Sequence, residues 1–124
     1  MPLVFIAIGG AGGAVARYLV DSWVAQRAAG AFPWGTLLIN VSGSLVLGLL
    51  FALATERDVL PASMRAPLMI GFLGAYTTFS TLMLESWRLF EDGAVGLAAV
   101  NVVGSSLLGL AAVFIGLALG RVLA

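Results

Sequence analysis

Four long apolar stretches, separated by short polar ones, set the pattern of this chain. They run over residues 3–24, 34–54, 67–90 and 94–122. A helix needs about 20 mostly apolar residues to cross the hydrocarbon core of a bilayer, and each stretch is long enough to do so. The pattern predicts an all-α membrane protein with four transmembrane helices that form a single domain over residues 1–124.

The third stretch carries polar residues near its centre, where a simple membrane span would not. Two glycines, Gly71 and Gly74, are followed by four hydroxyl side chains at Thr77, Thr78, Ser80 and Thr81. Lipid offers no hydrogen bonds, so clustered polar groups persist at that depth only inside protein or beside a water-filled cavity. This run is therefore the best candidate for a permeation site.

Composition narrows the possible functions. The chain is 61% hydrophobic and 10% charged, its formal net charge is zero, and it contains no histidine and no cysteine. It has no lysine either, which leaves arginine as its only basic residue. These absences remove the commonest general base, thiolate metal sites and Schiff-base chemistry. We therefore expect neither an enzyme nor a nucleic-acid-binding protein, since no basic patch is present.

A ten-residue pattern occurs twice. The segments 40–49 and 101–110 are identical at seven of ten aligned positions, which predicts that the two halves of the chain are diverged copies. In each copy an asparagine, a serine and a glycine follow at i, i+4 and i+8 on one helix face: Asn40, Ser44 and Gly48, then Asn101, Ser105 and Gly109. Such faces serve helix packing, while an asparagine amide can also replace water around an anion.

The arginines are almost evenly divided between the two ends of a four-span protein. Arg57, Arg65 and Arg121 fall on the side of the termini, and Arg27 and Arg88 fall opposite. A bias of three to two is too small to fix one orientation by the positive-inside rule. The sequence favours a chain that inserts both ways and forms an antiparallel homodimer, and a single orientation is the alternative.

The charged residues inside the predicted spans include Arg17, Asp21 and Glu85. Arg17 and Asp21 are four residues apart and can pair on the helix, or Arg17 can give a vestibule a positive potential that concentrates anions. Glu85 lies one turn from the end of the third span, three residues before Arg88, which could neutralise it. Ionisable groups in membrane spans are candidates for functional sites.

Three motifs together resemble one family, the Fluc (CrcB) fluoride channels of microbes. They are GGAGGAVARY at 9–18, GTLLINVSGSLVLG at 35–48 and GFLGAYTTFST at 71–81. The resemblance covers essentially the whole chain, and its most specific part is TTFST at 77–81. It implies a passive fluoride exporter in the inner cell membrane, built as an antiparallel dual-topology homodimer with two pores and a third helix that is broken mid-membrane.

The resemblance also implies roles for particular residues. A structural Na+ at the two-fold axis would be held by the backbone carbonyls of Gly74 and Thr77, and Arg17 would lie near a vestibule. The pore residues implied are Asn40, Phe79 and Ser105, with Glu85 near a pore end. The hydroxyl cluster and the helix face of Phe79 add Thr78, Ser80, Thr81 and Leu82 as candidates for the anion path. At Leu82 the chain departs from the family, which typically has a second pore phenylalanine there.

Two other functions compete with fluoride export. A small dual-topology multidrug transporter would need a membrane carboxylate in the first span, where only Asp21 is available. A non-transporting assembly subunit would use its polar faces for helix packing alone. Uptake of a lipophilic cation distinguishes the first alternative, and absence of ion flux distinguishes the second.

Overall fold

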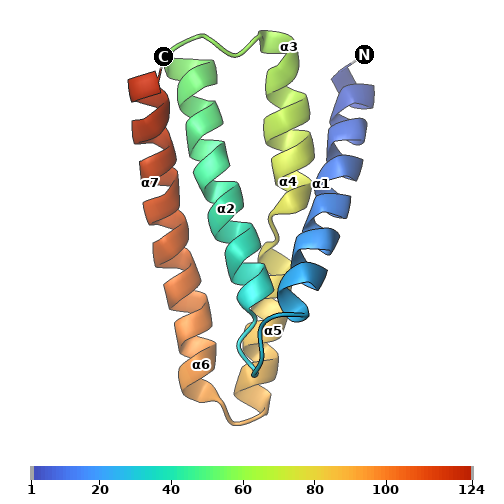
Figure 1. The fold of residues 1–124 in the computed structure, drawn as a ribbon, viewed down its shortest axis with the longest axis vertical. Coiled ribbons are helices and arrows are strands. Elements are labelled where there is room, and N and C mark those ends of the chain that lie inside the picture. Colours follow the sequence, from blue (N-terminus) through green and yellow to red (C-terminus); the bar gives the residue numbers. More distant parts are fainter. Residues whose placement is uncertain (1, 124) are drawn as a thin grey trace.

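The computed structural model describes residues 2–123 as four helical rods joined by short connections (Figure 1). The first rod is α1 (Pro2–Ala25), and the second consists of α2 (Trp34–Phe51) and the π-helical segment η1 (Ala52–Glu56). The third contains α3 (Ala62–Arg65), the π-helical η2 (Ala66–Phe72), α4 (Leu73–Tyr76) and α5 (Phe79–Glu91). The fourth contains α6 (Val95–Ala99), the π-helical η3 (Val100–Gly104) and α7 (Ser105–Leu123).

All four rods are long and apolar enough to cross a membrane, which confirms the prediction of four spans. The chain is therefore a multi-pass membrane protein. Large apolar side chains cover its outer surface, as expected for a protein whose surroundings are lipid. The two largest fully buried side chains are Ile39 and Asn101, so a polar amide occupies part of the small core.

The third rod begins earlier than the sequence pattern suggested. Its first helix starts at Ala62, directly after Pro61, whereas the apolar stretch was expected to begin at residue 67. Pro67 lies inside the rod, where a proline removes a backbone donor and clashes with the carbonyl four residues earlier. The structure widens to a π-helix over Ala66–Phe72, and hydrogen bonds spanning five residues accommodate the proline without ending the rod.

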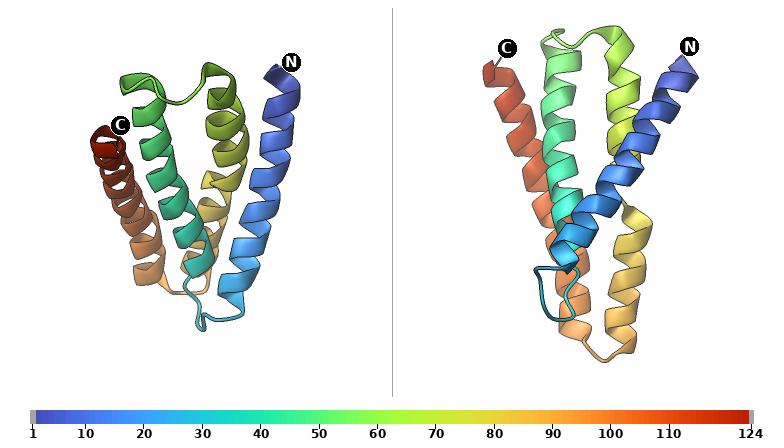
Figure 2. Two further views of the ribbon diagram at one scale, coloured as in Figure 1. Left: turned by 45° about the horizontal axis from the view of Figure 1, so that its top comes forward. Right: turned by 45° about the vertical axis from the view of Figure 1, so that its right-hand side comes forward.

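The ends of the rods are arranged so that both termini and the connection from η1 to α3 lie at one end of the molecule (Figures 1 and 2). The hairpin between α5 and α6 lies at the opposite end. Its turn is tight because Gly93 adopts a positive φ of 83° and Ala94 donates its N–H to the Leu89 carbonyl at 2.8 Å.

Glycines bring the helix backbones into direct contact. On α7, a Cβ at Gly116 would overlap the Leu45 carbonyl, and one at Gly120 would overlap the Ala52 side chain. On α1, a Cβ at Gly13 would overlap the Phe72 carbonyl. Small residues at such contacts let membrane helices approach closely enough for backbone atoms to touch. These contacts fix α2 against α7, and α1 against the third rod.

We expect Gly116→Ala to separate α2 from α7 and to lower the free energy of unfolding by about 1–3 kcal/mol, the usual cost of overpacking. Gly96→Ala is the matched control, because nothing lies within 4 Å of a Cβ at Gly96. It should leave stability unchanged or raise it by up to about 1 kcal/mol through helix propensity. Thermal unfolding in detergent measures both, and equal shifts would contradict the packing described.

Candidate functional site

Two residues of the third rod leave the helical conformation. Thr77 has φ −76° and ψ 154°, and Thr78 has φ −148° and ψ 113°, so both are extended. Helix α4 ends before them at Tyr76, and α5 begins after them at Phe79. A helix end leaves N–H and C=O groups without intrahelical partners, and in an apolar protein these groups need partners from elsewhere.

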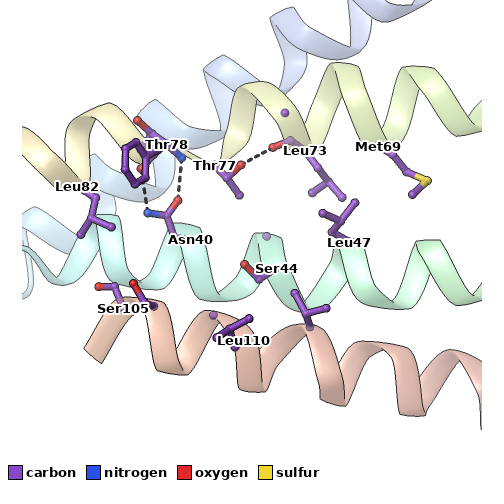
Figure 3. Close-up of a pocket in the computed structure, with 16 residues that line it drawn as sticks. Asn40, Ser44, Leu47, Met69, Leu73, Thr77, Thr78, Leu82, Ser105 and Leu110 are labelled. Atoms are coloured by element: carbon purple, nitrogen blue, oxygen red, sulfur yellow. Dashed lines mark hydrogen bonds between the residues drawn. The ribbon is translucent and has the colours of Figure 1, made fainter. Parts of the chain in front are cut away.

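Asn40 on α2 supplies both partners for Thr78. Its Nδ2 donates to the Thr78 carbonyl at 3.0 Å, and the Thr78 N–H donates to its Oδ1 at 2.8 Å (Figure 3). The side-chain amide thus pairs with the backbone of Thr78, which is 9% exposed, as a neighbouring strand would. This pair holds α2 against the two extended residues.

Other side chains form hydrogen bonds with the residues just before the interruption. Arg17 on α1 donates from Nε to the Ala75 carbonyl at 3.1 Å. The Tyr76 hydroxyl lies 2.9 Å from Ser42 Oγ, which itself donates to the Ile39 carbonyl. Thr77 donates from both its N–H and its hydroxyl to the Leu73 carbonyl. Helices α1 and α2 therefore both hold the end of α4.

The start of α5 is capped locally. Thr78 Oγ1 accepts the Thr81 N–H at 3.3 Å, the usual arrangement for a threonine N-cap. The same hydroxyl donates its proton to Thr81 Oγ1 at 2.9 Å. Thr81 therefore receives a hydrogen bond, and its own proton remains available to another acceptor.

These bonds leave two backbone carbonyls open. Within residues 2–123, neither Gly74 nor Thr77 accepts a side-chain hydrogen bond at its carbonyl, and neither carbonyl accepts a bond across the extended segment. Gly74 is exposed and Thr77 is half-buried. Uncharged carbonyl oxygens of this kind suit hard cations.

A cavity of about 420 Å³ lies between α2, the third rod and α7 (Figure 3). Among the residues predicted for the site, it is lined by Asn40, Gly74, Thr77, Thr78, Phe79, Leu82 and Ser105. None of the residues that line this cavity is charged. Phe79 is 74% exposed whereas Leu82 is 7% exposed, so the cavity has a closed wall at Leu82 and an open side at Phe79.

A second cavity of about 290 Å³ lies between α1, α2 and α5, and its lining includes Arg17, Asp21, Thr36 and Thr81. Thr78 lines this cavity and the first one. The extended segment therefore separates two cavities. The second is lined by a cationic and an anionic side chain, and the first is lined by no charged side chain.

Two predicted pore residues line neither cavity. Ser80 is exposed, and Glu85 lies one turn farther along α5. Within residues 2–123, the Glu85 Oε1 atom is buried and has no hydrogen-bond partner. Thr36 and Asp21 lie near the carboxyl group of Glu85.

Neither of the two pairings considered within single helices forms among the described residues. Among the described residues, Arg17 forms no ion pair with Asp21, and its Nε donates to the Ala75 carbonyl on the third rod. Asp21 instead packs against Gly35 at the start of α2. Arg88 does not neutralise Glu85 in the same part of the chain, since Arg88 is exposed while the Glu85 carboxyl turns inward.

Sequence reasoning missed Thr36, which is 2% exposed and lines the second cavity. Thr36 also lies near the carboxyl group of Glu85. A signal for it was present, because Thr36, Asn40 and Ser44 follow at i, i+4 and i+8 and so share one face of α2. The polar stripe on α2 thus extends one turn farther toward the α1–α2 connection than the repeated motif indicates.

The hydrogen-bond donors that remain determine what the first cavity can bind. An asparagine amide has two N–H groups, and Asn40 uses one of them on Thr78. Within residues 2–123, the Ser44 hydroxyl has no hydrogen-bond partner, and it also lines the cavity. An uncharged chamber with spare N–H and O–H donors can solvate a small anion without a fixed positive charge.

We expect Asn40→Leu to lower the free energy of unfolding by about 1–3 kcal/mol for each Thr78 backbone group left without a partner. Ser44→Ala, one turn farther along the same face, is the matched control and should change stability little, since its hydroxyl bonds to no described residue. Thermal unfolding in detergent compares the two variants. Equal melting temperatures would show that the Asn40 amide does not hold the extended segment.

Comparison with known proteins places these features in a family. A profile described as CrcB-like protein, Camphor Resistance (CrcB), matches residues 4–117. Similar curated proteins include those of Magnetococcus marinus (44% identity, 99% of this chain and 100% of the relative), Agrobacterium fabrum (47%, 96% and 95%) and Symbiobacterium thermophilum (48%, 97% and 98%). Each of these relatives is named a fluoride-specific ion channel. By the profile match and by these full-length similarities, the chain belongs to the CrcB family.

Proposed function

We propose that this protein is a fluoride channel that exports the ion passively and so relieves its toxicity. The observation that carries the proposal is the uncharged cavity around Asn40, which places spare amide and hydroxyl donors beside the interruption of the third rod. The names of relatives similar over nearly the whole chain support the same ion. The protein would reside in the inner cell membrane.

The side chains of the cavity suit an anion that must leave as readily as it enters. Amide and hydroxyl donors replace part of the hydration shell, and the ring of Phe79 offers its positive edge. A fixed cation inside the cavity would hold fluoride too firmly, and conduction requires sites weak enough to release the ion. Arg17 lies in the neighbouring cavity, where its charge attracts anions to the path without binding them within it.

Export needs no energy source besides the membrane potential. A potential that is negative inside drives a single negative charge outward with about 2.3 kcal/mol per 100 mV. The proposed path passes Thr81 in the second cavity and Thr78, which lines both cavities. It then passes Asn40, Phe79 and Ser105 in the first cavity. Leu82 forms an apolar part of the wall, while Ser80 and Glu85 belong to the approaches.

We propose that two protomers assemble as an antiparallel dimer, with the interrupted part of each third rod near the middle of the membrane. The first cavity is open on the side of Phe79, and Ile70 and Gly74 are exposed on the same rod. Extended backbone is stable at membrane depth only where protein or a water-filled cavity covers it. A second protomer would cover this side and complete the pore.

The carbonyl groups of Gly74 and Thr77 would hold a Na+ at the centre of that dimer. They are open among the described residues, and oxygen ligands match the preference of a hard cation. Broken membrane helices hold such ions through freed carbonyls. The ion would supply positive charge that balances these dipoles. Arg17 and Thr77 keep neighbouring carbonyls occupied, so the remaining two are presented to the ion.

Fluoride efflux from liposomes, followed with a fluoride electrode under an outward gradient, tests the proposed function. We expect rapid efflux of fluoride and little efflux of chloride. We expect Phe79→Ala to slow fluoride by about tenfold or more, because it removes one contact on the path. Chloride efflux as fast as that of fluoride, or proton-coupled uptake of a lipophilic cation in its place, would exclude a fluoride channel.

Removal of Na+ tests the cation site separately. Dialysis against N-methylglucamine should lower the melting temperature of the dimer, and added NaCl should restore it in a saturable manner, because a ligand bound only by the folded state stabilises it. N-methylglucamine chloride at equal ionic strength is the control. A melting temperature that depends on ionic strength alone would exclude a specific Na+ site.

A further inference from the structure

Asn101, the counterpart of Asn40 in the repeated motif, has a different environment. It lies in η3, is 0% exposed, and does not line either of the two cavities around the extended segment. A buried amide must find partners for both its N–H and its C=O groups, or burial is costly. Its partners are two serines, Ser86 on α5 and Ser105 at the start of α7.

The three side chains form one chain of hydrogen bonds with a single direction. Ser105 Oγ donates to Asn101 Oδ1 at 3.4 Å, Asn101 Nδ2 donates to Ser86 Oγ at 2.9 Å, and Ser86 Oγ donates to the Leu82 carbonyl at 2.8 Å. Both serines are 6% exposed, so little water competes with these bonds. Bonds in such a chain polarise one another and strengthen together.

Both ends of this chain are walls of the first cavity. Leu82 and Ser105 line it from α5 and α7, and Figure 3 draws them at the same end of the cavity. Asn101 lines neither cavity and connects these two walls through its bonds to Ser105 and Ser86. Movement of α5 relative to α7 would therefore break a bond of Asn101 before it could change the width of the cavity at Leu82.

The proton of Ser105 gives the network a second consequence. A serine hydroxyl has one proton, and Ser105 directs it to Asn101 rather than into the cavity. At 3.4 Å this bond is longer than the usual 2.5–3.0 Å for hydroxyl donors, so it is the weakest in the chain. An anion in the cavity can recruit Ser105 as a donor only by drawing the proton away from Asn101.

We propose that Asn101 is a positioning residue for the pore. It sets the spacing of Leu82 and Ser105. Its Oδ1 accepts the Ser105 hydroxyl proton until an anion in the cavity replaces it as the acceptor. The proposal rests on the proposed fluoride conduction and adds a role for a residue outside the path. Asn40 bonds to the backbone of Thr78 in the interruption, whereas Asn101 bonds to the side chain of Ser105 in the cavity wall.

A double-mutant cycle between Ser86 and Ser105 tests this role, since Asn101 is what joins the two hydroxyl groups. The variants are Ser86→Ala, Ser105→Ala and the pair, with fluoride efflux measured in liposomes. We expect the combined loss of rate to differ by about threefold or more from the product of the single losses. In an Asn101→Leu background this coupling should disappear. Ser63→Ala, an exposed serine in α3, controls for hydroxyl removal and should leave efflux unchanged.

Melting temperature and the fluoride-to-chloride rate ratio accompany each efflux measurement. We expect Ser86→Ala to change that ratio while the dimer stays folded, which a purely structural role would not do. If the unmodified chain conducts fluoride and the single losses simply multiply, Asn101 does not position the pore. If the unmodified chain carries no fluoride, the proposed function itself is wrong. If Asn101→Leu fails to fold, the double-mutant cycle of Ser86 and Ser105 alone still tests whether the two serines are coupled.

Discussion

The structure depends on the pairing of the Asn40 amide with the backbone of Thr78. An apolar protein can interrupt a helix only where another group satisfies the freed N–H and C=O, and here one side chain satisfies both. With this pair in place, α2 is fixed beside the extended residues, Thr78 can cap α5, and the donors left over face the cavity. Arg17 and Ser42 strengthen the same region from two helices.

Both asparagines of the repeat connect the third rod to a neighbour, but they do so with different chemistry. Asn40 pairs with backbone and keeps a donor for the cavity, whereas Asn101 is fully buried and pairs with serines. The same ten-residue pattern thus meets an extended segment in one half and a regular helix in the other. Side-chain chemistry alone does not decide which asparagine lines a cavity; the backbone opposite each one does.

The sequence was enough to predict the four spans, because length and hydropathy decide which segments can cross a membrane. The cluster of hydroxyls coincides with the interruption of the third rod, since Thr77 and Thr78 are the residues that leave the helix. The early start at Ala62 was missed because one proline and four charged residues give the stretch 55–66 the composition of a loop. The partners of Arg17 and Glu85 were missed because local spacing favours neighbours on the same helix, whereas Ala75 is 58 residues from Arg17.

The open carbonyls of Gly74 and Thr77, like the peptide of Thr78, are main-chain atoms, which every residue possesses. Substitution at these positions leaves the backbone oxygen atoms in place, so side-chain mutagenesis cannot remove the carbonyl groups themselves. The information that specifies them is carried by distant side chains, Asn40 and Arg17, which determine where the backbone is exposed and which carbonyls are already occupied. Variation that would alter the proposed Na+ site is therefore to be sought on α1 and α2, on helices that do not contain these carbonyl groups.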